Sequence, residues 1–189
     1  MKSTLLLILL IFTLHINIAF AQQNKTSQSS SEIDQLYKEY KDKKYISIYT
    51  SGKDLIGEIK ITLNSKLLPQ SIEISGTGAR LDIAEIFYNL IQQKKAKGYS
   101  LYQGDNYEQG ISPEGIEYIA MLMDNFMGGT GFNAVYKKGN MFSKLGSSKE
   151  TTSYIDFNLQ RQSTTIYTFS LINEDYSRKG TNNKTNFKF

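Results

Sequence analysis

Residues 45–63 read YISIYTSGKDLIGEIKITL, and this segment carries the clearest indication of the fold. Its first part is rich in β-branched and aromatic residues, and its second part alternates apolar with polar side chains, as half-buried strands do. Ser51-Gly52-Lys53-Asp54 lies between the two parts and favours a hairpin turn. We therefore expect antiparallel strands here. Half-alternating strands also argue against a parallel sheet that is covered on both faces.

A second hairpin is predicted over residues 153–172. Its strands, 153–160 and 164–172, are joined by a short polar turn near Arg161. Apolar and polar side chains alternate along the first strand, as they do in half-buried strands. The alternating residues are Ile155, Phe157 and Leu159.

The best-specified helix lies between Asp82 and Gly98. Acidic residues near its start and lysines near its end match the helix dipole, and Gly98 is placed to end it in a left-handed cap. Two further helices are predicted, one opening at Ser31 and one at Ser112-Pro113-Glu114. The apolar stripe of the first-named helix is made by Ile83, Ile86, Phe87, Leu90 and Ile91.

Further strands are predicted at residues 70–75, 99–103 and 132–136. The whole order predicts an α+β domain, with an antiparallel or mixed sheet of about six to seven strands and three helices packed mainly on one face. We expect a single domain over residues 32–173, a flexible linker at 22–31, and a polar C-terminal tail at 174–189.

The first 21 residues predict a signal peptide. Lys2 gives a positive start, an apolar run follows from Leu5 to Phe12, and Ala19-Phe20-Ala21 supplies the small-x-small pattern of a cleavage site. The apolar run is too short for a membrane span, and no later segment approaches the roughly 20 apolar residues that a span needs. We expect an exported protein, periplasmic or secreted. The absence of disulfides and of a lipid-accepting cysteine after the apolar run favours a soluble bacterial export over a lipoprotein.

Composition excludes several kinds of chemistry. The chain has no cysteine and no tryptophan, and its one histidine, His15, lies inside the predicted signal peptide. A Ser-His-Asp triad, a Cys-His dyad and a His-ligated zinc site are therefore excluded from the exported protein. The net charge of +4 includes Lys2 and is spread along the chain, which argues against a nucleic-acid partner. We expect no cofactor and no metal.

The loop at residues 99–108 (YSLYQGDNYE) is the predicted ligand-binding site. Tyrosines offer flat contact area with a polar end, and carboxylates can orient a sugar or an amine. An ordinary solvated loop is the alternative, because loops are normally polar. The candidate residues are Tyr99, Tyr102, Asp105, Tyr107 and Glu108.

Ser75-Gly76-Thr77-Gly78-Ala79-Arg80 is a second candidate, placed between a strand and a helix. It resembles the opening of a dinucleotide-binding turn, in which glycines let backbone N–H groups approach a phosphate. Leu81 occupies the third glycine position of that pattern, so a plain tight turn is the alternative. The weaker expectation is an anion contact that uses Gly76, Gly78 and Arg80.

The leading hypothesis is a non-catalytic binding module for a protein or a cell-envelope ligand, a class that includes inhibitor and immunity-type proteins. Export, the missing catalytic side chains and the tyrosine-rich strands favour it. The first alternative is a carboxylate-dependent glycan hydrolase that uses Asp105 or Glu108. The second is a small-ligand carrier with an enclosed apolar pocket beneath the sheet.

Overall fold

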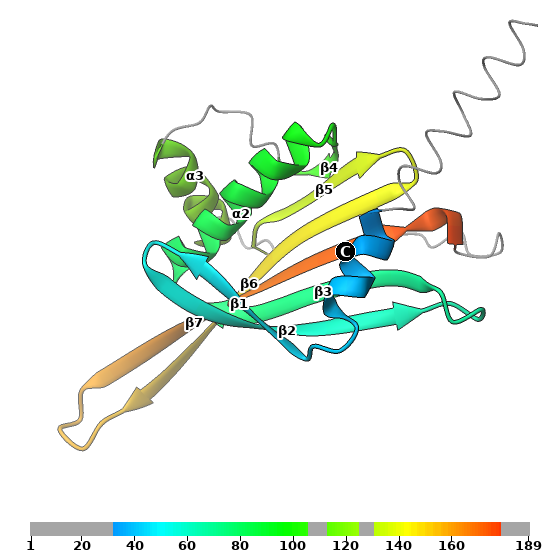
Figure 1. Cartoon of the computed structure of the whole chain (residues 1–189). Helices are drawn as coiled ribbons and strands as arrows, with labels where there is room; N and C mark the ends of the chain where they lie inside the picture. The colour runs from blue at the N-terminus through cyan, green and yellow to red at the C-terminus, as the bar shows by residue number, and fades with distance from the viewer. Residues whose placement is uncertain (1–31, 106–112, 125–130, 179–189) are drawn as a thin grey trace, which may run out of the picture.

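The computed structural model describes residues 32–105, 113–124 and 131–178. The predicted signal peptide and linker lie outside these residues, so the structure does not bear on them (Figure 1). A helix at residues 32–40 comes first. The elements that follow are β1 (Tyr45–Thr50), β2 (Lys53–Leu63), β3 (Pro69–Gly78), α2 (Arg80–Ala96), β4 (Ser100–Gly104), α3 (Pro113–Asp124), β5 (Asn133–Lys138), β6 (Met141–Ile155), β7 (Arg161–Asp175) and the 3₁₀ turn η1 (Tyr176–Arg178).

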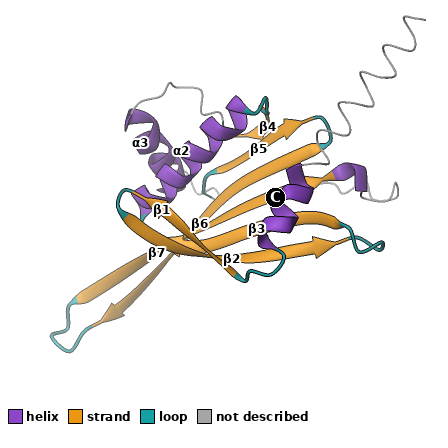
Figure 2. Ribbon diagram, in the orientation of Figure 1, coloured by secondary structure: helices purple, strands orange, loops and turns teal. Residues whose placement is uncertain are grey.

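The strands form one seven-stranded sheet in the order β1-β2-β3-β7-β6-β5-β4, and every neighbouring pair is antiparallel (Figure 2). The chain leaves β3 in the middle of the sheet through α2, forms the edge strand β4, and returns through α3 to β5. This topology confirms the predicted α+β class. The β1–β2 turn is shorter than expected, because Thr50 pairs with Lys53 and only Ser51 and Gly52 form the turn.

One face of the sheet carries the core. Ile72 on β3 and Phe169 and Leu171 on β7 are buried there, and helix α2 adds Phe87, whose ring lies 5.2 Å from that of Phe132. Polar contacts also attach helices α2 and α3 to this face. Lys94 of α2 donates to Asn173 at 2.9 Å, and Tyr167 donates to Asp124 of α3 at 2.6 Å.

Helix α2 confirms the strongest local prediction. Its apolar stripe is buried except for the partly buried Leu90, Asp82 lies in its first turn, and Lys94 and Lys95 lie in its last turn. Gly98 has φ +82°, a left-handed conformation that a side chain would strain. Its N–H donates to the carbonyl of Lys95 at 2.9 Å, which closes the helix as the sequence predicts.

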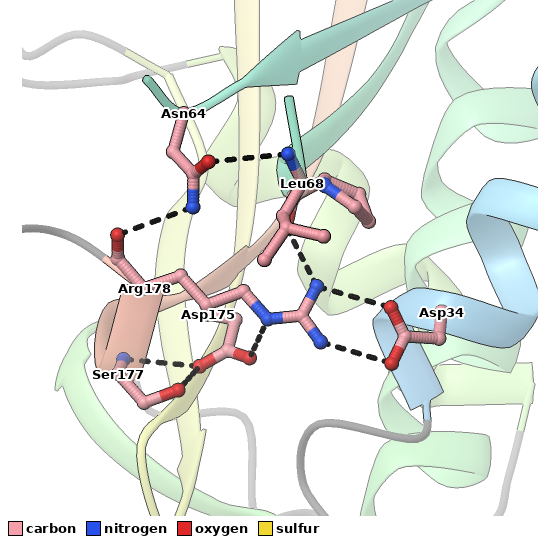
Figure 3. Close-up of polar contacts among 7 residues, drawn as sticks. Asp34, Asn64, Leu68, Asp175, Ser177 and Arg178 are labelled. Carbon is pink, nitrogen blue, oxygen red and sulfur yellow. Dashed lines mark hydrogen bonds and ion pairs between the residues drawn. The ribbon is translucent and has the colours of Figure 1, made fainter. Parts of the chain in front are cut away.

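An arginine joins the first described helix to the sheet (Figure 3). The guanidinium of Arg178 donates two hydrogen bonds to Asp34, at 3.0 and 2.9 Å, and a third to the carbonyl of Pro69 at 3.0 Å. Its Nε lies 3.3 Å from the fully buried Asp175. Regular structure therefore continues into the expected polar tail from 174, since β7 extends to Asp175 and η1 follows at Tyr176–Arg178.

The second predicted hairpin is present, but its register is wrong. Strand β6 begins at Met141, twelve residues before the predicted start at Ser153, and the turn is at Asp156–Gln160 instead of near Arg161. Ile155, Phe157 and Leu159, whose alternation is typical of a half-buried strand, are all exposed.

The predicted turn at residues 75–80 is absent, because β3 continues through Gly78 and α2 begins at Arg80. The two glycines meet a packing need. A Cβ on Gly76 would lie 2.9 Å from the carbonyl oxygen of Ile56 and 3.0 Å from the ring of Phe169, and a Cβ on Gly78 would lie 2.9 Å from Leu55. The glycines thus let neighbouring side chains lie over the strand.

Gly76→Ala is expected to lower the free energy of unfolding by about 1–3 kcal/mol, because the added methyl group overpacks the space between Phe169 and the backbone of β2. Urea denaturation followed by circular dichroism measures the change. Ser75→Ala is the matched control on the other face of the strand and should change stability by less than about 0.5 kcal/mol. Equal stability of Gly76→Ala and the unchanged protein would contradict this account of the glycine.

Candidate functional site

The outer parts of β6 and β7 project away from the rest of the molecule as a two-stranded ribbon (Figure 1). We call residues 148–166 the arm. Every residue of the arm is exposed except Asp156, which is partly buried. The strands leave the sheet here because their neighbours end: β5 pairs with β6 only as far as Gly146, and β3 pairs with β7 only from Tyr167 onward.

The tip of the arm is a tightly hydrogen-bonded turn. The carboxylate of Asp156 accepts from the N–H groups of Asn158 and Gln160, both at 2.9 Å, and from the side chain of Gln162 at 3.1 Å. The N–H of Leu159 donates to the carbonyl of Asp156 at 3.0 Å. These bonds hold the pKa of Asp156 below its usual value, the bond from Gln160 first among them, so the carboxylate stays ionised at neutral pH.

The turn presents apolar side chains to solvent. Phe157 is 95% exposed, Leu159 is 87% exposed, and Ile155 beside them is 70% exposed. Leu159 also has φ +61°, a conformation that is uncommon for a leucine and costs about 1–2 kcal/mol. A fixed turn therefore displays two apolar groups that stabilise nothing in the described part of the chain.

The β2–β3 loop has the same construction. Asn64 accepts from the N–H groups of Lys66 and Leu68, at 2.9 and 3.1 Å, and Leu67 has φ +58° and is 76% exposed. This loop belongs to the body of the protein, because Asn64 also contacts the carbonyl of Arg178 at 3.5 Å (Figure 3). Leu67 is thus a natural control for Leu159, with the same backbone conformation at another place.

Asp124 marks the base of the arm. Its carboxylate accepts hydrogen bonds from Tyr167 on β7 and from Arg80 at the start of α2, and Lys149 on β6 donates to its backbone carbonyl. Partial burial alone raises the pKa of Asp124, but the bond from Tyr167 and the charges of Arg80 and Lys149 outweigh it and hold the pKa below its usual value. Four elements therefore meet at one carboxylate where the arm leaves the sheet.

The described members of the predicted ligand-binding set, Tyr99, Tyr102 and Asp105, have different surroundings. Tyr99 is buried and donates to Glu32 at 2.8 Å, with the Lys94 ammonium 4.6 Å from its ring centre, and burial raises the pKa of Tyr99. Tyr102 is exposed and lies edge-on to Phe142, 5.6 Å between ring centres.

Asp105 accepts from the N–H of Asn133 at 2.8 Å, which extends the β4–β5 pairing by one residue. Tyr107 and Glu108 lie outside the described residues. The described part of the expected site is thus divided: Tyr99 is buried, Tyr102 is exposed, and Asp105 lies at the end of β4.

The predicted anion contact is also rearranged. Gly76 and Gly78 lie within β3, and Arg80 donates to Asp124. Two of the acidic residues near the start of α2 have partners of their own: Asp82 lies 3.5 Å from Lys53, and Glu85 accepts from Ser51. In the three described ranges, no group of three or more histidine, cysteine, aspartate or glutamate residues is arranged to hold a metal ion.

A shallow depression of about 220 Å³ lies between β5, β6 and β7. Its walls include Val135, Lys144 and Ile172, and Gly146 forms part of its floor. These residues alternate with the buried Ala134, Leu145 and Leu171, so the depression lies on the face opposite the core. Its one cation, Lys144, is paired with Glu174 at 3.0 Å.

Comparison with known proteins gave no match: no family model fits the chain, and no curated protein or solved structure resembles it closely enough to show a relationship.

Asp124→Asn should lower the free energy of unfolding by about 1–2 kcal/mol at neutral pH, since it removes the charge that Arg80 and Lys149 face. The pKa of Asp124 is lowered by folding, so its contribution is complete above the unfolded value near 4 and is lost as pH falls through the folded pKa. Denaturation of both proteins between about pH 7 and pH 2 should show the difference shrinking in acid. A difference independent of pH would contradict the assignment.

Leu159→Asn should tighten the tip of the arm, because asparagine tolerates the left-handed conformation and the leucine side chain has no buried contact to lose. Amide hydrogen exchange at Asn158 and Gln160 should slow by a few-fold while global stability stays within about 0.5 kcal/mol. Faster exchange at these amides would show that Leu159 supports the turn.

Proposed function

We propose that this chain is an exported, non-catalytic binding protein that engages a protein ligand with the tip of the arm, residues 155–159. The observation that carries this proposal is the display of Phe157 and Leu159 by a rigid turn. Apolar side chains at the centre of protein interfaces supply much of the binding energy, and a turn already fixed in shape loses little entropy on binding.

The magnitudes support a contact of useful strength. Burying a phenylalanine or leucine side chain is worth about 1.5–3 kcal/mol each. Phe157 and Leu159 together therefore supply about 3–6 kcal/mol, to which Ile155 adds at the edge. Arg161 and Tyr154, one or two positions back from the tip, are of the types enriched among residues that dominate interface energies.

The chemistry of the tip favours a protein over a lipid surface. Asp156 stays ionised between Ile155 and Phe157, and moving a charged carboxylate into hydrocarbon is costly. The arm carries as many cations as anions, Lys149 and Arg161 against Glu150 and Asp156, so it gains nothing from anionic headgroups. Within the described residues no helix is both long and apolar enough to cross a membrane. A protein pocket with an apolar lining and a hydrogen-bond donor at its edge would accept both the apolar side chains of the tip and the carboxylate of Asp156.

The two alternatives gain no specific support. Asp105, the described acid of the hydrolase hypothesis, is engaged by the backbone of Asn133. The carrier hypothesis needs an enclosed pocket beneath the sheet, and the depression at Gly146 is open and lies on the face opposite the core.

Capture from a bacterial envelope extract tests the proposal. The purified protein, Phe157→Ala and Leu159→Asn are immobilised, and the retained proteins are quantified by mass spectrometry. A ligand that the unchanged protein retains should bind each variant about tenfold or more weakly, since each loses roughly 1.5–3 kcal/mol of apolar contact.

Leu67→Asn is the matched control. It removes another largely exposed leucine with a similar backbone conformation, but from the β2–β3 loop. Capture should be unchanged in this variant. Equal retention by Leu159→Asn and Leu67→Asn would show that the tip is not the binding element.

A further inference from the structure

The arm leaves a long strand edge without a partner. Past Ser147, whose N–H donates to Phe132, no described strand pairs with the outer edge of β6, and this edge runs from Ser148 to Ile155. A row of unused backbone donors and acceptors is a template for another strand. Charges and proline normally protect such edges, yet residues 151–155 (TTSYI) contain neither.

We infer that the β6 edge of the arm pairs antiparallel with the same edge of a second copy of this chain, about a two-fold axis perpendicular to the ribbon. This inference rests on the proposed role of the arm as the binding element and names a second partner for it. Closed two-fold contacts are the commonest way for identical chains to associate, because one patch serves both copies.

The charges of the edge restrict where the axis lies. In an antiparallel pair about such an axis, the residue on the axis faces its own copy, and directly opposed side chains lie on one face of the sheet. An axis through Lys149 or Glu150 places like charges opposite each other, which is unfavourable. An axis through Thr151 or Thr152 opposes no like charges and pairs threonine with threonine.

Pairing joins residues 148–155 of the two copies in one backbone ladder. A two-stranded hairpin alone is only marginally stable in water, so pairing into a four-stranded ribbon stabilises both arms. The zero net charge of the arm lets two copies approach without repulsion. The tips then point in opposite directions.

Single-cysteine variants test this arrangement directly, because the chain has no cysteine of its own. Opposed residues in an antiparallel pair have Cα atoms about 4.5–5.5 Å apart, within the range of a disulfide. Under mild oxidation, Thr151→Cys or Thr152→Cys should form a covalent dimer at least tenfold faster than Thr165→Cys on the β7 edge of the arm. Ser47→Cys is the second control, placed on the free edge strand β1.

Sedimentation of the unmodified protein supplies the second measurement, with the mass expected to rise from one chain to two as concentration increases through the micromolar range. A mass of one chain throughout, or cross-linking no faster at Thr151 and Thr152 than at Thr165 and Ser47, would overturn the inference. The capture experiment separates the two proposals. A monomeric protein with tip-dependent capture leaves the proposed function standing, while a dimer without such capture refutes the proposed function alone.

Discussion

The pairing of β6 with β7 is the interaction on which the rest of the structure depends. These strands pair over fifteen residues each in the middle of the sheet, with β3 on one side and β5 on the other. The inner half of the pair carries the core, through Leu145, Phe169 and Leu171. The neighbouring strands are shorter, so the outer half has no place in the sheet and must project as the arm. The mismatch in strand length thus produces both the stable body and the exposed element.

The base of the arm is fixed to the body more firmly than a simple continuation of two strands requires. The carboxylate of Asp124 accepts hydrogen bonds from Tyr167 of β7 and Arg80 of α2. Lys149 of β6 donates to the backbone carbonyl of Asp124 at the end of α3. Partly buried hydrogen bonds to a charged group are worth more than neutral ones. The direction in which the arm leaves the sheet is therefore set by both helices as well as by the two strands.

Local signals in the sequence predicted much of the body. The apolar stripe of α2 and the alternation in β2 each bury one face of a regular element, and a period of 3.6 or 2 is visible without knowledge of the partner. The first twelve residues of β6 were not predicted, because two of its inward positions, Ser143 and Ser147, are small and polar and hide the alternation with Met141 and Leu145. The Gly139-Asn140 turn before it was a usable signal, since that dipeptide is typical of a two-residue hairpin.

The errors at residues 75–80 and at the arm have different physical causes. Gly76 and Gly78 suggested a turn, but each is needed where Phe169 and Leu55 cross the strand, a tertiary requirement that local reasoning does not reveal. The turn at Asp156–Gln160 was invisible because a leucine, and not a glycine, occupies its left-handed position.

The exposure of Ile155, Phe157 and Leu159 is the most instructive difference from the sequence pattern. Alternating apolar residues are typical of a half-buried strand, whose apolar face is normally covered by the same chain. The described residues do not cover this face. The hydrogen-bonded turn holds these side chains in place, and the left-handed conformation of Leu159 costs free energy. Within the described fold, no buried contact of these side chains offsets that cost. Burial against a second molecule would account for this pattern, and this is the physical basis for the proposal that the arm binds a protein ligand.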